Sequence, residues 1–229
     1  MDLPPDFDVY IGGAEETLGQ RDVELLRAID SYGSINRAAT ELGRSYSRAQ
    51  QRIVALEECF GDLVERNRGG SGGGGSALTE RARSLTVRYE RLQAAVTGVA
   101  ETEETVLSGK VVDREGRLAT VETSVGTVKA LAPPDSEKLS LAVQADAVTL
   151  QAPDETPSPD ATSARNHLSG TVKSLERGEG VSHVTVDVGA AVDLSAIVTV
   201  ASVERLGLEK GAPVTVSFKA TATRGVPTT

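Results

Sequence analysis

Cysteine, tryptophan and long apolar runs are scarce or missing from this sequence. Its 229 residues include one cysteine, no tryptophan and 3% aromatic residues. A single cysteine, Cys59, excludes an internal disulfide framework, and two scattered histidines make no plausible zinc site. No stretch is apolar enough to span a membrane. The start, MDLPPDFDVY, has no basic segment and no apolar run, so we expect no signal peptide and a cytoplasmic protein.

A recognisable catalytic constellation is also missing. The sequence has no Ser, His and Asp order, no carboxylate pair in an apolar setting and no phosphate-binding loop. His183 alternates with valines and should face solvent, while His167 has no evident partner. We therefore expect a protein that is not an enzyme and that holds no metal and no covalent cofactor.

The distribution of charge matters more here than its sum. The net charge of −9 argues against a nucleic-acid partner. Residues 31–91, however, hold ten arginines against seven acids, so this segment is locally positive. An acidic, lysine-poor balance is also typical of proteins that work at high salt, where screening weakens phosphate contacts. That reading of the host stays a hypothesis.

The stretch from Ser34 to Phe60 predicts two short helices joined by a tight turn. Apolar residues recur at helical spacing on both segments, at Ile35, Ala38, Ala39 and Leu42, then at Tyr46, Ala49, Ile53, Leu56 and Phe60. Gly33, Gly43 and Gly61 mark helix ends, and Ser34 and Ser45 suit N-caps. This pattern is typical of a helix-turn-helix, whose second helix enters the DNA major groove.

The solvent face of the second helix indicates its partner. Arginine can bind guanine or phosphate, glutamine can pair with adenine, and serine can reach either base or phosphate. An ordinary solvated helix face is the alternative, but caps, turn and charge together favour double-stranded DNA. The residues assigned to DNA contact on this helix are Arg44, Ser45, Ser47, Arg48, Gln50, Gln51 and Arg52.

Segments on either side complete a winged domain over residues 17–104. Residues 1–16 should form a loose arm, and residues 17–32 a helix packed on the other two. A strand near Leu63, a glycine run and a second strand near Leu78 predict a wing, although such a run can also be an inert linker. Arg66 and Arg68 would grip the sugar-phosphate backbone.

A long helix over residues 79–100 follows the wing. Its apolar residues are spaced alternately by four and three, as in a heptad seam: Leu85, Tyr89, Leu92, Val96 and Val99. The seam predicts a dimerisation helix, and packing against its own domain is the alternative. A homodimer would place two recognition helices about 34 Å apart and would call for a palindromic operator.

Beyond Glu104 the apolar period changes from 3.6 to 2, as short strands require. Residues 107–111 match residues 168–172, and residues 139–145 loosely match residues 213–220. We therefore expect two copies of one small β-barrel, over residues 105–151 and 165–229. Residues 152–164, rich in Pro, Asp, Ser and Thr, read as a linker between them.

The glycine-rich wing, LVERNRGGSGGGGSALT, followed by two β-repeats resembles ModE-type molybdate-responsive transcription regulators over nearly the whole chain. The second repeat carries the SARN residues 163–166, the TxxS residues 199–202 and Phe218-Lys219-Ala220 near its end. The resemblance implies an α+β multidomain fold: a winged helix-turn-helix with a long dimerisation helix, then two small OB-like TOBE barrels. It also implies an effector, molybdate or tungstate, bound at a subdomain interface.

The same resemblance implies an oxyanion site of Ser163, Arg165, Thr199, Ser202 and Lys219. A dianion removed from water needs fixed donors and compensating positive charge, which hydroxyls and the two cations can supply. Alternatively, the cations are ordinary surface charges and the hydroxyls cap a helical turn.

The first repeat departs from this pattern. It lacks SARN and TxxS, and it places Gln144 and Asp146 near the position of Lys219, so we expect a degenerate copy. Two other functions stay open at this stage: an oxyanion buffering or storage protein, and a regulator whose degenerate TOBE domains only dimerise.

Overall fold

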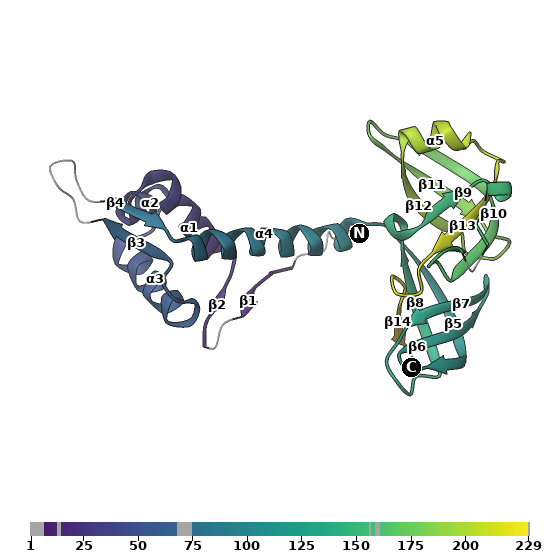
Figure 1. The fold of residues 1–229 in the computed structure, drawn as a ribbon, viewed down its shortest axis with the longest axis horizontal. Coiled ribbons are helices and arrows are strands. Elements are labelled where there is room, and N and C mark those ends of the chain that lie inside the picture. The colour runs from purple at the N-terminus through teal and green to yellow at the C-terminus, as the bar shows by residue number, and fades with distance from the viewer. Residues whose placement is uncertain (1–6, 13–14, 68–74, 156, 159–160, 229) are drawn as a thin grey trace. The chain divides into compact units, whose positions relative to one another are not determined.

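The computed structural model describes residues 7–12, 15–67, 75–155, 157–158 and 161–228. The chain divides into two compact units, Met1–Glu101 and Thr102–Thr229 (Figure 1). The mixed α+β fold predicted from the sequence is confirmed, with helices in the first unit and mostly strands in the second. No helix within the described residues is long and apolar enough to cross a membrane.

The first unit is a three-helix core with a strand hairpin on each side and a long final helix. Its elements are β1 (Ile11–Gly12), β2 (Thr17–Leu18), α1 (Gln20–Tyr32), α2 (Ile35–Glu41), α3 (Tyr46–Phe60), β3 (Val64–Asn67), β4 (Gly75–Leu78) and α4 (Glu80–Glu101). Strand β3 pairs antiparallel with β4 and forms the wing. The two predicted strands are therefore present, and residues 68–74 between them lie outside the described residues.

Residues 7–12 do not form the loose arm that the sequence predicted for residues 1–16. Val9 and Ile11 are 8% and 6% exposed and belong to the core of the first unit. Ile11 pairs with Leu18, so Thr17 and Leu18 form a strand and α1 begins only at Gln20. Apolar residues at every second position favour a strand over a loop, and Val9 and Ile11 follow this spacing.

The helix-turn-helix signals of the sequence are confirmed in detail. Ser34 Oγ accepts from the Arg37 N–H and Ser45 Oγ from the Arg48 N–H, both at 3.4 Å. Gly43 lies between α2 and α3 with φ of 65°, a left-handed conformation that glycine adopts at little cost. The expected apolar stripe is buried from Ala49 to Phe60, but Tyr46 is 49% exposed because it sits in the first turn, away from the core.

The predicted seam on α4 divides between two environments. Tyr89 is 2% exposed, and Leu85 and Val96 are partly buried against the core of their own unit. Leu92 and Val99 are 40% and 58% exposed. Packing against its own domain, the alternative reading, therefore holds for three of the five seam residues.

The second unit consists of two five-stranded β-structures. The elements are β5 (Glu104–Glu115), β6 (Leu118–Thr123), β7 (Gly126–Leu131), β8 (Lys138–Gln144), η1 (Ala145–Ala147), β9 (Thr149–Gln151), η2 (Pro153–Glu155), β10 (Asn166–Arg177), β11 (Val181–Asp187), β12 (Leu194–Thr199), α5 (Val200–Leu206), β13 (Pro213–Phe218) and β14 (Arg224–Pro227). One structure is a closed barrel in the order β14-β7-β6-β5-β8, and the other is a sheet in the order β12-β11-β10-β13-β9.

Strand register supports the internal repeat. A bulge interrupts β5 between Val111 and Asp113 and β10 between Val172 and Ser174, at equivalent positions. Gly170 lies so close to β11 that an added Cβ would meet Val186 Cγ1 at 2.5 Å, and Gly109 is crowded in the same way. Each repeat therefore needs glycine where its long first strand crosses its neighbour.

The two repeats exchange their last strands. Strand β9, from the first repeat, pairs with β13 of the second. Strand β14, from the second, pairs with β8 and β7 of the first. The predicted boundaries at residues 151 and 165 therefore do not separate two self-contained barrels, because each repeat completes the other. One hydrophobic cluster runs through both.

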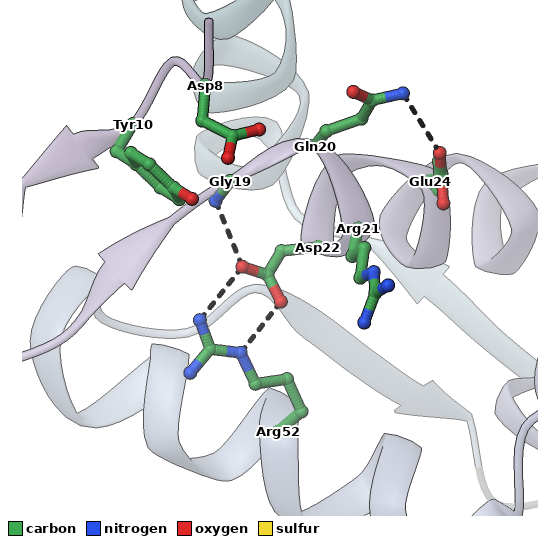
Figure 2. Close-up of a pocket in the computed structure, with 8 residues that line it drawn as sticks. All are labelled: Asp8, Tyr10, Gly19, Gln20, Arg21, Asp22, Glu24 and Arg52. Atoms are coloured by element: carbon green, nitrogen blue, oxygen red, sulfur yellow. Dashed lines mark hydrogen bonds and ion pairs between the residues drawn. The ribbon is translucent and has the colours of Figure 1, made fainter.

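An arginine on α3 ties together three segments of the first unit. Arg52 donates from Nε and Nη2 to the two carboxylate oxygens of Asp22 at 2.7 and 2.8 Å (Figure 2). It also donates to Glu16 Oε2 at 2.7 Å and to the Thr17 carbonyl at 2.6 Å. The hydrogen bonds to Asp22 hold the pKa of Arg52 above its ordinary value. The helix-turn-helix, α1 and the first hairpin are thus joined through one guanidinium group.

We expect Arg52→Met to lower the free energy of unfolding by about 1–3 kcal/mol, because it leaves the buried Asp22 carboxylate without its cation. Urea unfolding of the full chain, followed by circular dichroism, measures the change. Arg48→Met is the matched control on the same helix, and it should change stability by less than about 0.5 kcal/mol since its side chain is exposed. Equal losses in the two variants would contradict this account.

Candidate functional site

The start of α3 presents an open polar face. Ser45, Ser47, Arg48 and Gln51 are exposed, while Gln50 is half-buried and accepts a 3.5 Å hydrogen bond from the Tyr46 hydroxyl. Within the described part of the chain, the Arg48 guanidinium has no hydrogen-bond or ion-pair partner. Donors that are already solvated and unpaired can bind bases or phosphates without first breaking an internal contact.

Two arginines predicted to contact DNA are instead engaged inside the unit. Arg44 donates to the Arg21 carbonyl at 2.8 Å and to Glu24 Oε2 at 3.1 Å, and Arg52 makes the contacts described above. Arg44 lies in the turn before α3 and Arg52 lies on α3, and both side chains bond to residues of α1. Their acidic partners lie 20 to 36 residues earlier in the sequence, so spacing along α3 gave no sign of them.

A groove lies between α2, the start of α3 and the wing. Its volume is about 460 Å³, and its lining residues are Ser34, Ile35, Asn36, Tyr46, Arg66 and Ser76. Arg66 is exposed on β3, opposite Ser76 on β4, as a wing cation should be. Arg68, the other predicted wing contact, lies outside the described residues. Asn36 and Tyr46 were missed as groove residues because nothing in the sequence places them beside the wing, and Ser76 was missed although it lies on the wing strand β4.

A larger cavity of about 600 Å³ lies beside the first hairpin (Figure 2). Three carboxylates line it, from Asp8, Asp22 and Glu24, together with Arg21 and Arg52. Three carboxylates against two arginines leave the lining with an excess of one negative charge. Like charges repel strongly where water is partly excluded, and an oxyanion or a DNA phosphate is therefore a poor occupant.

A third cavity, of about 340 Å³, brings together part of the predicted oxyanion site. It lies where β9, the residues before β10 and the end of β13 meet, and it is lined by Ala147, Thr149, Gln151, Thr162, Ser163, Ala164, Ser217, Phe218, Lys219 and Ala222. Ser163 and Lys219 are both in this lining, and Lys219 is its single charged residue. Arg165 is exposed beside it and donates to the carbonyl of Thr162 at 2.6 Å.

A hydrogen-bond relay runs from His167 to Ser217 and Gln151, which line this cavity. His167 Nδ1 lies 3.0 Å from Ser217 Oγ, and His167 Nε2 lies 3.0 Å from the Ala164 carbonyl oxygen. Ser217, which is 3% exposed, contacts Gln151 Oε1 at 2.8 Å. The expectation that His167 lacks a partner is therefore wrong, because the pairing of β10 with β13 sets Ser217 opposite His167. His183 is exposed, as predicted.

The last residue of the SARN motif joins the two repeats. Asn166 is 2% exposed; its side chain accepts from the Lys129 N–H at 2.8 Å and donates to the Lys129 carbonyl at 3.0 Å. Thr105 holds the matching position in the first repeat and accepts from the Ser195 N–H at 3.1 Å. Each repeat thus bonds to a strand of the other at the start of its first long strand.

The remaining two predicted residues lie elsewhere. Thr199 caps α5: its Oγ1 accepts from the Ser202 N–H at 3.2 Å, and the two hydroxyl oxygens are 2.9 Å apart. Thr199 pairs with Val181, beside the far end of β10, whereas Lys219 lies beside the start of that strand. At about 3.3 Å per residue, the twelve residues of β10 separate the two groups by on the order of 35 Å along the strand. One chain does not gather all five predicted residues into one cavity.

The strand register also identifies the residues of the first repeat that are equivalent to Arg165 and Lys219. Asn166 pairs with Phe218, and Thr105 pairs with Val143. One residue further out, the second repeat has Arg165 and Lys219, whereas the first has the pair Glu104 and Gln144. Two cations are thus replaced by one acid and one amide, which disfavours an anion at the equivalent position.

Two family models match separate parts of the chain. A model of the TOBE domain matches residues 162–224, and a model of bacterial regulatory helix-turn-helix proteins of the lysR family matches residues 20–83. The second match covers α1 to the start of α4, and the first covers β10 to the start of β14. Both describe binding modules rather than catalytic domains.

Several relatives match across nearly the whole chain. The molybdenum-pterin-binding protein MopA of Rhodobacter capsulatus is 29% identical over 91% of this chain and 91% of its own length. The molybdenum transport protein ModE of Herbaspirillum seropedicae is 29% identical over 90% of this chain and 62% of its own length. The DNA-binding transcriptional dual regulator ModE of Escherichia coli K12 is 29% identical over 87% and 63%. The chain thus spans about three fifths of these two ModE proteins. The chain therefore joins a lysR-type helix-turn-helix to a TOBE domain, and over most of its length it is similar to both Mop and ModE proteins.

Proposed function

We propose that α3 and the wing bind operator DNA and that molybdate or tungstate, bound in the second β-repeat, changes that binding. One observation carries the proposal: a single chain combines an unpaired polar face on a helix-turn-helix with a hydroxyl-rich cavity that holds a lysine. An effector changes DNA affinity only if it binds two states of the protein unequally. The proposal needs no chemical reaction, no metal and no covalent cofactor, and it places the protein in the cytoplasm with its operator.

The DNA contacts that we propose follow the exposed face of α3 and the base of the wing. Ser45, Ser47, Arg48 and Gln51 would enter the major groove, with Gln50 at the edge of this face. Arg66 would contact a backbone phosphate, and Arg68, which lies outside the described residues, stays in the set as predicted from the sequence. Arg44 and Arg52 are left out of this set, because their donors already hold α3 against α1.

A homodimer fits two features of the chain. Val87, Leu92 and Val99 expose apolar surface along α4, and a second copy could cover it. In a two-fold dimer, the far end of β10 from one copy can meet the near end of β10 from the other. Thr199 and Ser202 of one protomer would then complete the cavity of its partner, which a single chain leaves incomplete. Two matched DNA heads call for a palindromic operator.

The anion chemistry is that of a fixed, cationic, hydroxyl-lined site. Lys219 and Arg165 would balance the charge of a tetrahedral dianion, while Ser163, Thr199 and Ser202 would donate hydrogen bonds. Thr199 is the N-cap of the short α5, which begins at Val200, and Ser202 is held in its first turn by that cap. Molybdate and tungstate carry the same charge and shape, so the residues described here give no reason to separate them.

Oxyanion storage is the second candidate function. It is favoured by the similarity to MopA, which also extends over nearly the whole chain. The unpaired Arg48 and the exposed wing cation Arg66 favour regulation, because storage has no use for a DNA-binding face.

We expect Arg48→Met to weaken binding to operator DNA by about 10–100-fold, the effect of losing one good base or phosphate contact. Fluorescence anisotropy with labelled promoter fragments, at fixed salt, measures it. Molybdate affinity should not change. Arg205→Met, an exposed arginine on α5, is the control and should leave both affinities intact. If the DNA affinity of Arg48→Met equalled that of the wild type, α3 would not be part of the DNA interface.

We expect Lys219→Ala to abolish tight binding of molybdate and tungstate in calorimetric titration, because the cavity then has no charged residue. Gln144→Ala alters the equivalent position of the first repeat and should bind both anions as the wild type does. Sulfate, which is smaller, should bind neither variant nor wild type tightly. If Gln144→Ala were as damaging as Lys219→Ala, the two repeats would not differ as proposed.

Subunit mixing tests the shared site. Lys219→Ala and Ser202→Ala proteins, each unable to bind molybdate tightly, should together form heterodimers in which one of the two sites is intact. Co-expression with two affinity tags isolates the heterodimer, and calorimetry counts its sites. Restored tight binding at about half the wild-type stoichiometry is the expected result. A heterodimer with no tight site would place all five residues around an anion within one chain.

A further inference from the structure

We propose that His167 is a positioning residue for the oxyanion site, and that its protonation state decides which end of the Gln151 amide faces the anion. The inference rests on the proposed function, since it concerns the same cavity. It also gives the site a property that the cationic residues alone would not confer. Anion binding and protonation of His167 become one coupled event.

The hydrogen-bond partners of His167 fix one of its two protons. Nε2 lies 3.0 Å from the Ala164 carbonyl oxygen, which can only accept, so Nε2 carries a hydrogen. Nδ1 lies 3.0 Å from Ser217 Oγ, which can either donate or accept. Whether the imidazole is neutral or charged therefore depends on whether Nδ1 accepts a hydrogen bond from Ser217 or donates one to it.

Ser217 has one hydroxyl proton and two neighbours. If His167 is neutral, Nδ1 accepts that proton, and the Ser217 oxygen must accept from Gln151, which turns the amide nitrogen inward. If His167 is charged, Nδ1 donates to Ser217, and Ser217 donates to Gln151 Oε1. The 2.8 Å distance between Ser217 Oγ and the Gln151 side-chain amide suits either arrangement, because the two ends of the amide exchange by rotation about one bond.

The orientation of Gln151 decides what the cavity offers to an anion. Gln151 lines the cavity, and the amide atom not bonded to Ser217 is free to face a ligand. With His167 charged, this atom is the NH₂ donor, for which no partner occurs among the described residues. With His167 neutral, it is a carbonyl oxygen, which repels an oxyanion. Ser217 is 3% exposed, so water does not readily substitute for either bond.

The charges around His167 make its protonation depend on the anion, because neighbouring cations disfavour a charged imidazole when no anion is bound. Arg165 before β10 and Lys219 after β13 are cations, whereas Asp146 of η1 and Asp154 and Glu155 of η2 are exposed acids outside the cavity lining. Strand β9 carries no charged residue. A dianion inside the cavity adds two negative charges close to the imidazole, which favours its protonated form. By reciprocity, protonation of His167 strengthens anion binding.

The test is calorimetric titration of the full chain with sodium molybdate between about pH 6 and 8.5, in buffers with different ionisation enthalpies. Wild type should take up a fraction of a proton per anion, approaching one. Its affinity should fall as pH rises, by at most about tenfold per pH unit. His167→Gln should lose both the proton uptake and the slope. His183→Gln, which removes the one other histidine of the sequence, should retain them.

Ser217→Ala provides a second variant if His167→Gln does not fold. It breaks the relay while leaving the imidazole in place, and it should bind molybdate with little dependence on pH. Wild-type binding without proton uptake, or an unchanged slope in folded His167→Gln, would overturn the role of His167 and leave the proposed anion site standing. If wild type binds no molybdate at any pH, the proposed site itself fails and the inference falls with it.

Discussion

The reciprocal exchange of β9 and β14 is the constraint on which the second unit depends. Because β9 crosses into the second sheet, Thr149 and Gln151 of the first repeat become walls of the cavity that holds Lys219. The first repeat has an acid and an amide where the second has two cations, yet the cavity cannot form without it. The hydrogen bonds of Thr105 and Asn166 across the repeats reinforce this dependence. A degenerate repeat can thus be indispensable to a site whose charged residues lie elsewhere.

Arginine serves two opposite purposes in the helix-turn-helix unit. Arg52 and Arg44 hold α3 against α1 through carboxylates, while Arg48 and Arg66 remain solvated on the surface that we assign to DNA. Lysine does not occur before residue 110, so one residue type supplies every fixed cation of this unit. The planar guanidinium suits both purposes, because it forms paired bonds with carboxylates as readily as with phosphates.

The distance along the sequence over which each interaction acts explains where prediction from the sequence succeeded and failed. Helical spacing, caps and glycines located α2, α3 and the wing, because these signals act within a few residues. The contacts of Arg52 with Asp22 and of His167 with Ser217 span 30 and 50 residues, and no local pattern encodes them. The exchange of β9 and β14 was not predicted for the same reason, since the sequence of a strand of three or four residues does not identify the strand that it pairs with. The predicted anion residues were chosen by motif, and β10 separates them.

The position of β14 in the sequence also sets the order in which the second unit can assemble. Strands β5 to β8 are synthesised first, but their barrel closes only when Arg224–Pro227 arrives about eighty residues later. During that interval β8 presents an unpaired edge, and β9 waits for β13 in the same way. Neither half can therefore finish folding ahead of the other, so a nascent chain has an aggregation-prone edge until β14 leaves the ribosome. The two repeats form a single folding unit whose completion depends on Arg224–Pro227.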